Sequence, residues 1–172
     1  VRHMPKKKRR KRSHKREGKK PVDFPEEFNR CARENDFAGQ EELIQQEIDL
    51  GNDSFHMHFG LGRSQIKQSK YAEAEQSFRT AMQKKGGPWK DMIKPDWLRC
   101  ANFEIGVCCF KQEKWADAAE FLTKAGPRAY PESEPKRCEY IYSAHQKLGR
   151  LDKAEAVLRR MIKRNIGDPV EN

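Results

Sequence analysis

The residues of this chain that are best suited to chemistry are its histidines and cysteines, and their spacing argues against a catalytic or metal site. His56 and His58 are two residues apart, so on a helix their side chains point in different directions, and no cysteine or carboxylate lies at a ligand-like spacing from them. Cys109 and His145 could serve as a thiol nucleophile and its base, but the repeat described below gives both residues the same core position. The sequence also lacks the glycine motifs that bind phosphates. We therefore expect a protein that is not an enzyme and that binds no cofactor and no metal.

The cysteines predict a reducing environment. Their number is odd, no Cys-x-x-Cys motif occurs, and two of them are adjacent and therefore poor disulfide partners. We expect free, mostly packed thiols at Cys31, Cys100, Cys108, Cys109 and Cys138. No apolar run reaches the ~18 residues that a membrane span needs. These features predict a soluble intracellular protein without a membrane partner, nuclear in a eukaryotic cell and otherwise cytoplasmic.

Positive charge is concentrated at the start of the chain. Residues 1–20 hold 12 of the 36 Lys and Arg residues and one of the 26 acidic residues, a net charge of +11, whereas the other 152 residues hold 24 basic and 25 acidic side chains. This segment has too few apolar residues to offset its ordering entropy, so we expect a disordered polybasic tail over 1–20. Apart from Arg2, its basic residues are Lys6, Lys7, Lys8, Arg9, Arg10, Lys11, Arg12, Lys15, Arg16, Lys19 and Lys20.

The tail has several candidate roles. Its first basic run resembles a nuclear-import signal, whose partner would be an importin. A polycation also binds the phosphates of nucleic acid, including ribosomal RNA, without sequence preference. Anionic lipid is a poorer candidate because no aromatic residue accompanies the charges. The remaining interpretation is a targeting or solubilising extension.

A repeated pattern of apolar and small residues runs through the rest of the chain and predicts helices throughout. In the best copy, small and large apolar residues lie three, seven and ten positions after Tyr71, which places them on one stripe of a helix. The same spacing begins again at Trp115 and at Leu151, and a weaker copy begins at Phe37. Each stripe is preceded by a second helical pattern of matching register. The sequence therefore predicts stacked helical hairpins.

This part of the chain resembles the tetratricopeptide-repeat (TPR) family. The best match to the small and large positions of that family is His58-x2-Leu61-Gly62 with Tyr71-x2-Ala74-x3-Phe78-x2-Ala81. Two further copies centre on Ile105-Gly106 with Trp115 and on Ile141-Tyr142 with Leu151. Because Tyr142 stands where the family has glycine, the helices of the last unit are expected to lie further apart. The resemblance covers about 21–166.

The resemblance implies an all-α, TPR-like solenoid of helical hairpins behind the polybasic tail. We expect three clear repeats and one degenerate N-terminal repeat. The units are predicted at about 21–53, 54–87, 97–130 and 135–166, followed by a C-terminal tail at 167–172.

The first helices of stacked hairpins line a concave groove, which in such solenoids holds a protein or peptide segment. The side chains that we expect to face this groove are Asn29, Arg33, Phe59, Arg63, Ile66, Lys67, Phe103, Val107, Phe110, Lys111, Glu139, Ser143, Gln146 and Lys147. An apolar floor beside a row of cations suits an amphipathic segment with acidic neighbours. The alternative is that these cations are ordinary solvated helix ends.

Two functions follow from this pattern, and the sequence leaves both open. The first is an adaptor or scaffold that binds a partner through the groove and uses the tail for anchoring or import. The second is a structural subunit of a larger assembly that contacts its partners through hairpin edges. A clamp for chaperone carboxylates is not expected, because only Asn29 fits among the matching positions. The last helix also predicts a weak end-to-end homodimer, since no separate capping helix follows it.

Overall fold

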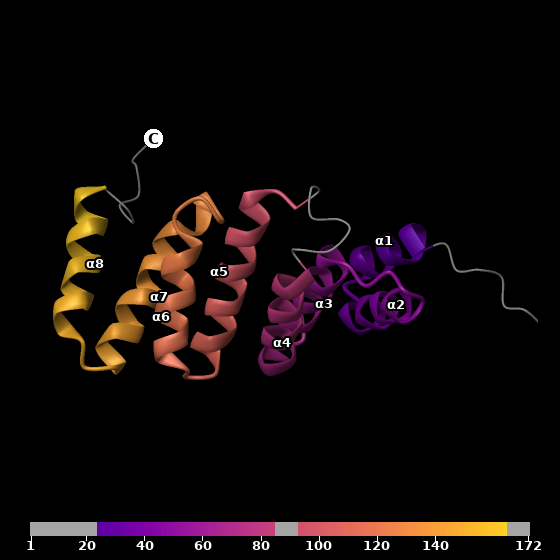
Figure 1. The fold of residues 1–172 in the computed structure, drawn as a ribbon, viewed down its shortest axis with the longest axis horizontal. Coiled ribbons are helices and arrows are strands. Elements are labelled where there is room, and N and C mark those ends of the chain that lie inside the picture. Colours follow the sequence, from indigo (N-terminus) through magenta and orange to yellow (C-terminus); the bar gives the residue numbers. More distant parts are fainter. Residues whose placement is uncertain (1–23, 85–92, 165–172) are drawn as a thin grey trace, which may run out of the picture.

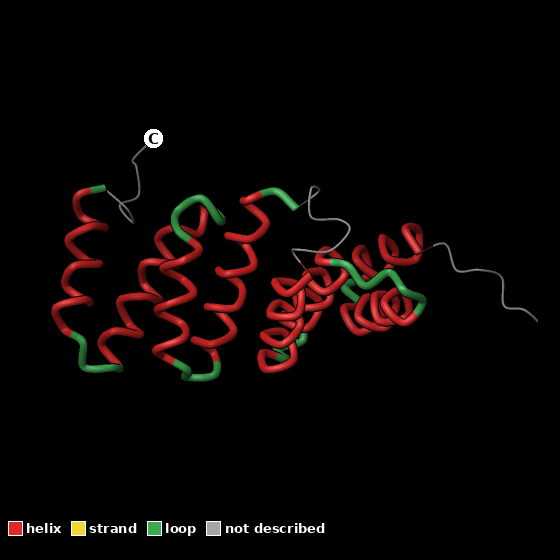
Figure 2. The backbone as a smooth tube through the Cα atoms, in the orientation of Figure 1, coloured by secondary structure: helices red, strands yellow, loops and turns green. Residues whose placement is uncertain are grey.

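The structure is a computed structural model that describes residues 24–84 and 93–164. In these two ranges the chain forms helices and no strand, as the tube in Figure 2 shows, so the predicted all-α fold class is confirmed. No helix in this part of the chain is long and apolar enough to cross a membrane. The helices are α1 (Phe24–Glu34), α2 (Phe37–Asp49), α3 (Phe55–Lys67), α4 (Tyr71–Gln83), α5 (Pro95–Lys111), α6 (Trp115–Ala125), the short 3-10 helix η3 (Pro131–Ser133), α7 (Glu134–Lys147) and α8 (Leu151–Lys163).

The helices pack in consecutive pairs. The pairs α1–α2, α3–α4, α5–α6 and α7–α8 form hairpins, and each second helix also packs against the first helix of the hairpin that follows it. In Figure 1 the hairpins succeed one another along the long axis of the molecule, from α1 at one end to α8 at the other. Contacts therefore join elements that are neighbours in sequence, which is the organisation of a helical-repeat solenoid.

Each second helix begins at the residue that opens a copy of the sequence repeat. Helix α2 begins at Phe37, α4 at Tyr71, α6 at Trp115 and α8 at Leu151. The small and apolar residues that follow at the repeat spacing are buried in α4 and α6. The sequence pattern thus located both the start and the buried face of these helices.

Two glycines set how closely the hairpin helices approach. A Cβ atom on Gly62 would lie 2.8 Å from the ring of Phe78, and one on Gly106 would lie 2.6 Å from Leu122. In the last hairpin Tyr142 takes this position, and α8 packs less extensively against α7 than α4 does against α3. The glycines therefore allow the close contact of the two central hairpins.

The turns within the hairpins share one backbone conformation. The residue two positions before each second helix has a φ between 55° and 66°, and in each turn the amide of the following residue donates to a carbonyl in the last turn of the first helix. This left-handed region favours glycine. The four residues that adopt it are Asn35, Ser69, Glu113 and Gly149.

The first hairpin departs from the repeat in its chemistry. Gln40 stands where α4 has Ala74, and its side chain is 7% exposed. Its Oε1 atom accepts a hydrogen bond from Ser64 Oγ of α3 at 3.4 Å. A polar pair thus replaces the usual contact between small apolar residues and joins the degenerate unit to the next one.

Candidate binding pocket

A cavity of about 390 Å³ opens beside α3, between the first hairpin and the start of α5. Helix α3 supplies most of its lining, from residues that recur every three or four positions and so share one helical face. The lining residues are Phe28, Phe37, Gln40, His56, Phe59, Gly60, Arg63, Ser64, Lys67 and Trp97.

Aromatic rings form the walls of this pocket. The ring of Phe59 meets Trp97 edge to face at a centroid separation of 5.3 Å, and it meets Phe78 in the same way at 5.3 Å. His56 also contacts Trp97, at 5.5 Å. Phe59 is 3% exposed and Trp97 is 38% exposed. Phe59 therefore forms a fixed floor, whereas Trp97 presents an accessible aromatic surface.

The start of α5 brings Trp97 to this place. Pro95 occupies the first turn of α5, where its fixed φ favours helix initiation and its missing N–H leaves no donor unsatisfied. Trp97 follows two residues later, and its indole packs back onto α3 against His56 and Phe59.

Two cations stand at the rim of the pocket. Arg63 and Lys67 are four residues apart on α3, line the cavity and are exposed. Lys67 Nζ lies 6.0 Å from the ring centroid of Phe37. Neither cation forms an ion pair with another of the described residues. Both charges are therefore available to a ligand.

The acidic group within range of these cations is Glu104 on α5. Burial raises the pKa of Glu104, while a hydrogen bond from Tyr130 and the charges of Arg63 and Lys67 act in the opposite direction. Tyr130 donates its hydroxyl to Glu104 Oε1 at 2.8 Å. Glu104 is therefore held by Tyr130 and forms no ion pair with either rim cation.

Three of the predicted groove residues gather around the cavity, and all three belong to the second unit. Ile66, predicted with them, instead packs against the core of the central hairpins. Asn29 and Arg33 are exposed on α1 and do not line the pocket. The three that line it are Phe59, Arg63 and Lys67.

The predicted groove residues of the third unit lie mostly in the core. Phe103 is 9% exposed, and its ring lies 5.0 Å from that of Tyr130. Val107 is partly buried against the same cluster, and Phe110 packs against the core of the central hairpins. Lys111 is exposed. None of these residues lines the pocket.

The predicted residues of the fourth unit also lie away from the cavity. On α7, Glu139 forms an ion pair within the helix, and Gln146 donates a hydrogen bond within the helix. Ser143 is partly buried and Lys147 is exposed. The basic residues of the tail over 1–20 lie outside the described residues, and their predicted contacts stay predictions.

Sequence reasoning missed seven lining residues, which are Phe28, Phe37, Gln40, His56, Gly60, Ser64 and Trp97. His56 precedes Phe59 by one helical turn, so the helical spacing of α3 could have identified it. Phe37 was recognised only as the residue that opens a repeat. Phe28 and Gln40 lie in the degenerate unit, and Gly60 and Ser64 share the helical face of α3 with Phe59. The position of Trp97 depends on how the chain continues from α4 to α5, where the sequence carries no periodic signal.

His58, His145 and the cysteines lie in structural settings. His58 Nε2 is 2.7 Å from Asp53 Oδ1. Burial lowers the pKa of His145, whose Nδ1 atom has no hydrogen-bond partner among the described residues. The prediction of free thiols is confirmed for all five cysteines. Burial raises the pKa of Cys109 to about 12, so this thiol stays protonated at neutral pH.

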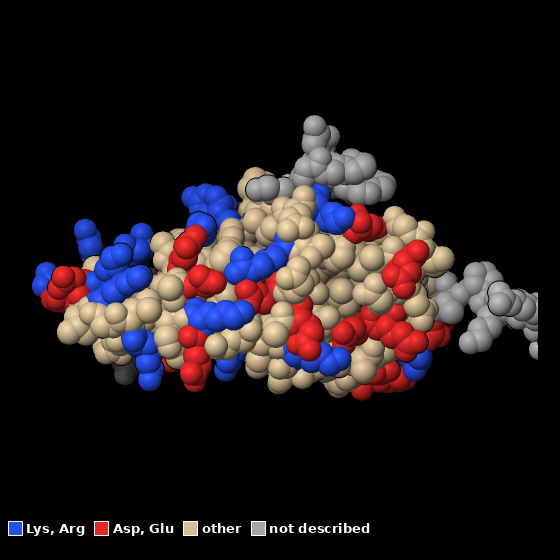
Figure 3. Space-filling view, turned by 60° about the horizontal axis from the view of Figure 1, so that its bottom comes forward, with Lys and Arg blue, Asp and Glu red and all other residues tan. Residues whose placement is uncertain are grey.

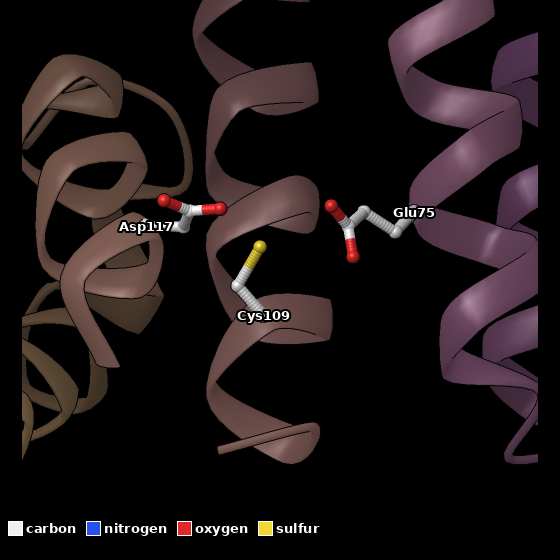
Figure 4. Close-up of side chains that lie close together, drawn as sticks. All are labelled: Glu75, Cys109 and Asp117. Carbon is white, nitrogen blue, oxygen red and sulfur yellow. The ribbon is translucent and has the colours of Figure 1, made fainter. Parts of the chain in front are cut away.

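Figure 4 shows the three donor groups that come closest to a metal-binding arrangement. Glu75, Cys109 and Asp117 bring one donor atom each within 4.8 Å of one another. Metal ligation requires a thiolate, whereas the Cys109 thiol is held protonated. Glu75 is already paired with Lys114 at 2.7 Å and with Arg79 at 2.8 Å. These groups are therefore better described as a packed ion-pair cluster than as a metal site.

The chain matches no protein-family model, and no curated protein is significantly similar to it. The function must therefore be argued from the pocket and from the surface of the stack.

Proposed function

We propose that this protein is a non-catalytic adaptor of the TPR type that holds a segment of a partner protein in the pocket beside α3. The observation that carries this proposal is the combination of an aromatic cavity with two cations that form no ion pair with another described residue. Phe59 and Trp97 offer apolar surface, and Arg63 and Lys67 stand at the rim. The hairpin stack and the glycine contacts of α3 and α5 support the assignment to TPR-type architecture.

The lining residues specify the chemistry of the segment. A large apolar side chain that enters the cavity would be desolvated against Phe59 and Trp97, as the central anchors of interfaces are. A carboxylate close to this anchor would meet Arg63 or Lys67, and an arginine can grip it with two parallel hydrogen bonds. The partner segment therefore carries an aromatic or long aliphatic residue with an acidic residue near it.

Binding of labelled peptides tests this proposal. Peptides that combine one large apolar residue with one acidic residue should bind the full chain, as measured by fluorescence anisotropy. Trp97→Ala and Arg63→Glu should each weaken binding by about tenfold or more, which corresponds to about 1.4 kcal/mol. The matched control is Lys147→Glu, which makes a similar charge change at an exposed position of α7 away from the pocket.

A second outcome would favour the structural-subunit alternative. If Arg63→Glu and Trp97→Ala bound partner segments as tightly as the unaltered protein while circular dichroism showed an intact fold, the pocket would not be the binding site. The exposed apolar residues of α8, which include Leu158 and Ile162, would then be the surface that supports function.

We assign the polybasic tail a separate anchoring role, with nucleic acid or an importin as its partner. Binding by the tail would depend steeply on salt, since each neutralised phosphate releases counterions. Nucleic-acid affinity of the full chain and of residues 21–172, measured across a salt series, tests this division. Equal affinity and equal salt slopes for the two proteins would show that the tail is not the nucleic-acid site.

A further inference from the structure

Consecutive hairpins are joined by a specific set of polar contacts. At the first junction, Gln68 Nε2 donates to the carbonyl of Phe37 at 3.1 Å and to Glu41 Oε2 at 2.7 Å. Lys70 Nζ pairs with the same carboxylate at 2.8 Å. The turn of the second hairpin thus supplies an amide and an ammonium donor. Helix α2, which precedes this hairpin, supplies the carboxylate of Glu41 and the carbonyl of Phe37, its first residue.

The second junction repeats these contacts with the corresponding residues. Gln112 Nε2 donates to the carbonyl of Tyr71 at 3.2 Å and to Glu75 Oε2 at 2.9 Å, and Lys114 Nζ pairs with Glu75 at 2.7 Å. Burial raises the pKa of Glu75, but its hydrogen bonds with Lys114, Arg79 and Gln112 outweigh this effect and lower it. We call this arrangement the junction clamp.

The third junction lacks the carboxylate and the amide of the clamp and keeps only a cation, Arg150, at the position of Lys70 and Lys114. Ala119 is the fifth residue of α6, where α2 and α4 have glutamate, and it is 4% exposed. Leu148 stands at the turn position of Gln68 and Gln112. Where the amide donor is missing, the carboxylate is missing as well. At the three junctions between described hairpins, the amide and the carboxylate therefore occur together or not at all.

Helix α8 carries the acceptor half of a clamp without a donor half. Glu155 is the fifth residue of α8, and it accepts a hydrogen bond from Arg159 Nε at 3.0 Å, just as Glu75 accepts one from Arg79 Nε at 2.8 Å. The side chain of Glu155 is 60% exposed, whereas that of Glu75 is 8% exposed. No turn from the described residues covers Glu155.

The apolar contact next to the clamp is uncovered in the same way. Phe78 and Leu122 occupy one repeat position in α4 and α6, and both are 0% exposed. Leu158 occupies this position in α8 and is 39% exposed, and Ile162, one turn later, is 76% exposed. Helix α8 thus has the outer face of an internal second helix, but no described hairpin covers it.

We infer that this face of α8 binds a helical hairpin of a partner protein and so extends the stack by one junction. The face is defined by Leu151, Glu155, Leu158, Arg159 and Ile162. The pocket beside α3 lies at the opposite end of the stack (Figure 1), so this inference does not rest on the proposed function. The occupant is a hairpin because α2 and α4, the second helices that also have a glutamate as their fifth residue, are each covered by one.

The internal junction of α4 defines the chemistry of the partner. The turn of the partner hairpin carries an amide and an ammonium group, as the turn with Gln112 and Lys114 does. Arg79, the counterpart of Arg159, lies 3.6 Å from Asp117 and 4.7 Å from the ring centroid of Phe121 on the second helix of the next hairpin. The partner hairpin therefore also carries a carboxylate and an aromatic ring on its second helix.

A second copy of this chain does not meet these requirements. In continued register, its first hairpin would present Glu34 and Asp36 where the clamp needs an amide and an ammonium donor, and these acceptors would face Glu155. Figure 3 shows many acidic side chains at the α1–α2 end and many basic ones at the α8 end, so the two ends attract in general. That attraction does not supply the missing donors, and the occupant is a different protein.

A fusion protein provides a probe of known chemistry. In this fusion a second copy of residues 85–130, which carry α5 and α6, is joined directly after Arg164, as the original copy follows Lys84. The appended hairpin should dock on α8 and slow amide hydrogen exchange in α8 by about tenfold or more, because its local opening becomes coupled to the new junction. In the fusion, Glu155→Ala should reverse most of this protection, whereas in the original chain the same substitution should leave exchange nearly unchanged.

The matched control is the same fusion with Gln112→Glu and Lys114→Asp in the appended copy only, which reproduces the chemistry of the first hairpin. It should protect α8 no more than the original chain does. Equal protection by both fusions, or by neither, would overturn the inference. Sedimentation of the full chain gives a further check. A dimer that the Leu158→Glu substitution dissociates would mean that a second copy occupies this face. A monomer supports a partner of different sequence.

Discussion

Arg137 and Glu134 form a two-point ion pair in the interior of the stack, with Nε 2.6 Å from Oε2 and Nη2 2.7 Å from Oε1. Arg137 Nη1 also donates to the carbonyl of Leu122 at 2.9 Å. Arg137 is 4% exposed. One side chain thus connects the start of α7 to the middle of α6, at the junction that has no clamp.

We predict that Arg137→Ala lowers the free energy of unfolding by about 3–5 kcal/mol, because it leaves a buried carboxylate and a carbonyl without their donors. Urea denaturation measures the effect. The neighbouring Lys136→Ala is the control, since Lys136 forms an exposed pair with Glu139 at 3.3 Å and should cost less than about 1 kcal/mol. Equal effects of the two substitutions would contradict a structural role for Arg137.

Gly106→Ala should destabilise the protein by about 1–3 kcal/mol, because the added methyl group overpacks the contact with Leu122. Its Cβ atom would lie 2.6 Å from Leu122 Cγ and 3.0 Å from the backbone nitrogen of Leu122. Gly60→Ala is the control, since its nearest neighbour would lie at 3.5 Å, an ordinary contact. That substitution should stabilise α3 by up to about 1 kcal/mol through helix propensity. Thermal denaturation of the two variants distinguishes steric conflict from propensity.

Ser69 and Gly149 occupy equivalent turn positions with left-handed φ values. Replacing the serine by glycine and the glycine by alanine should therefore change the stability in opposite directions. Ser69→Gly should raise the free energy of unfolding by up to about 1 kcal/mol, because φ is 59° at this residue and glycine adopts that value without strain. Gly149→Ala, at the corresponding turn of the last hairpin with φ of 66°, should lower it by about 1 kcal/mol. A stabilising Gly149→Ala would show that the turn relaxes to another conformation.

Glu104, which is partly buried, and Glu75, which is buried, should affect the pH dependence of stability in opposite directions. Burial raises the pKa of Glu104 above its usual 4.5, so its neutral form favours the folded state and this contribution is lost as the pH rises through the raised pKa. Glu104→Gln should therefore stabilise the protein at neutral pH and make little difference below pH 4.5. The amide oxygen can still accept the hydrogen bond from Tyr130.

Glu75 provides the matched comparison. Its hydrogen bonds lower its pKa below 4.5 despite burial, so its stabilising effect is present above that pH and is lost as the pH falls through the lowered pKa. Glu75→Gln should therefore destabilise the protein at neutral pH, with a difference that shrinks in acid. Denaturation midpoints from pH 3 to pH 8 test both variants. Parallel curves for all three proteins would contradict the pKa shifts.

Local periodicity was sufficient to predict the hairpin architecture. The starts of α4, α6 and α8 follow from Tyr71, Trp115 and Leu151 because a helical stripe must begin where its first core residue lies. Gly62 marks a close helix contact on similar grounds, because the apolar residues around it show that this position faces the neighbouring helix. These features depend on spacing within about one unit, which a single sequence displays.

The pocket and the junction clamp could not be predicted in this way. Gln112 and Glu75 are 37 residues apart, and their contact depends on how α5 packs on α4 after the segment that joins them. Trp97 reaches Phe59 for the same reason. Most predicted groove residues of α5 and α7 lie in the core or on exposed helix surface, because the pocket beside α3 does not continue as a groove along α5 and α7.

Stacking by nearest neighbours has a thermodynamic consequence for the two candidate surfaces. The pocket belongs to α1, α2, α3 and the start of α5, whereas the exposed face of α8 belongs to the far end, and α8 buries only Ala154 and Val157. In a linear array, energy passes between the ends only through every unit that separates them. A partner bound to the exposed face of α8 should therefore leave the affinity of the pocket unchanged. The two proposed partners would then bind to one molecule independently of each other.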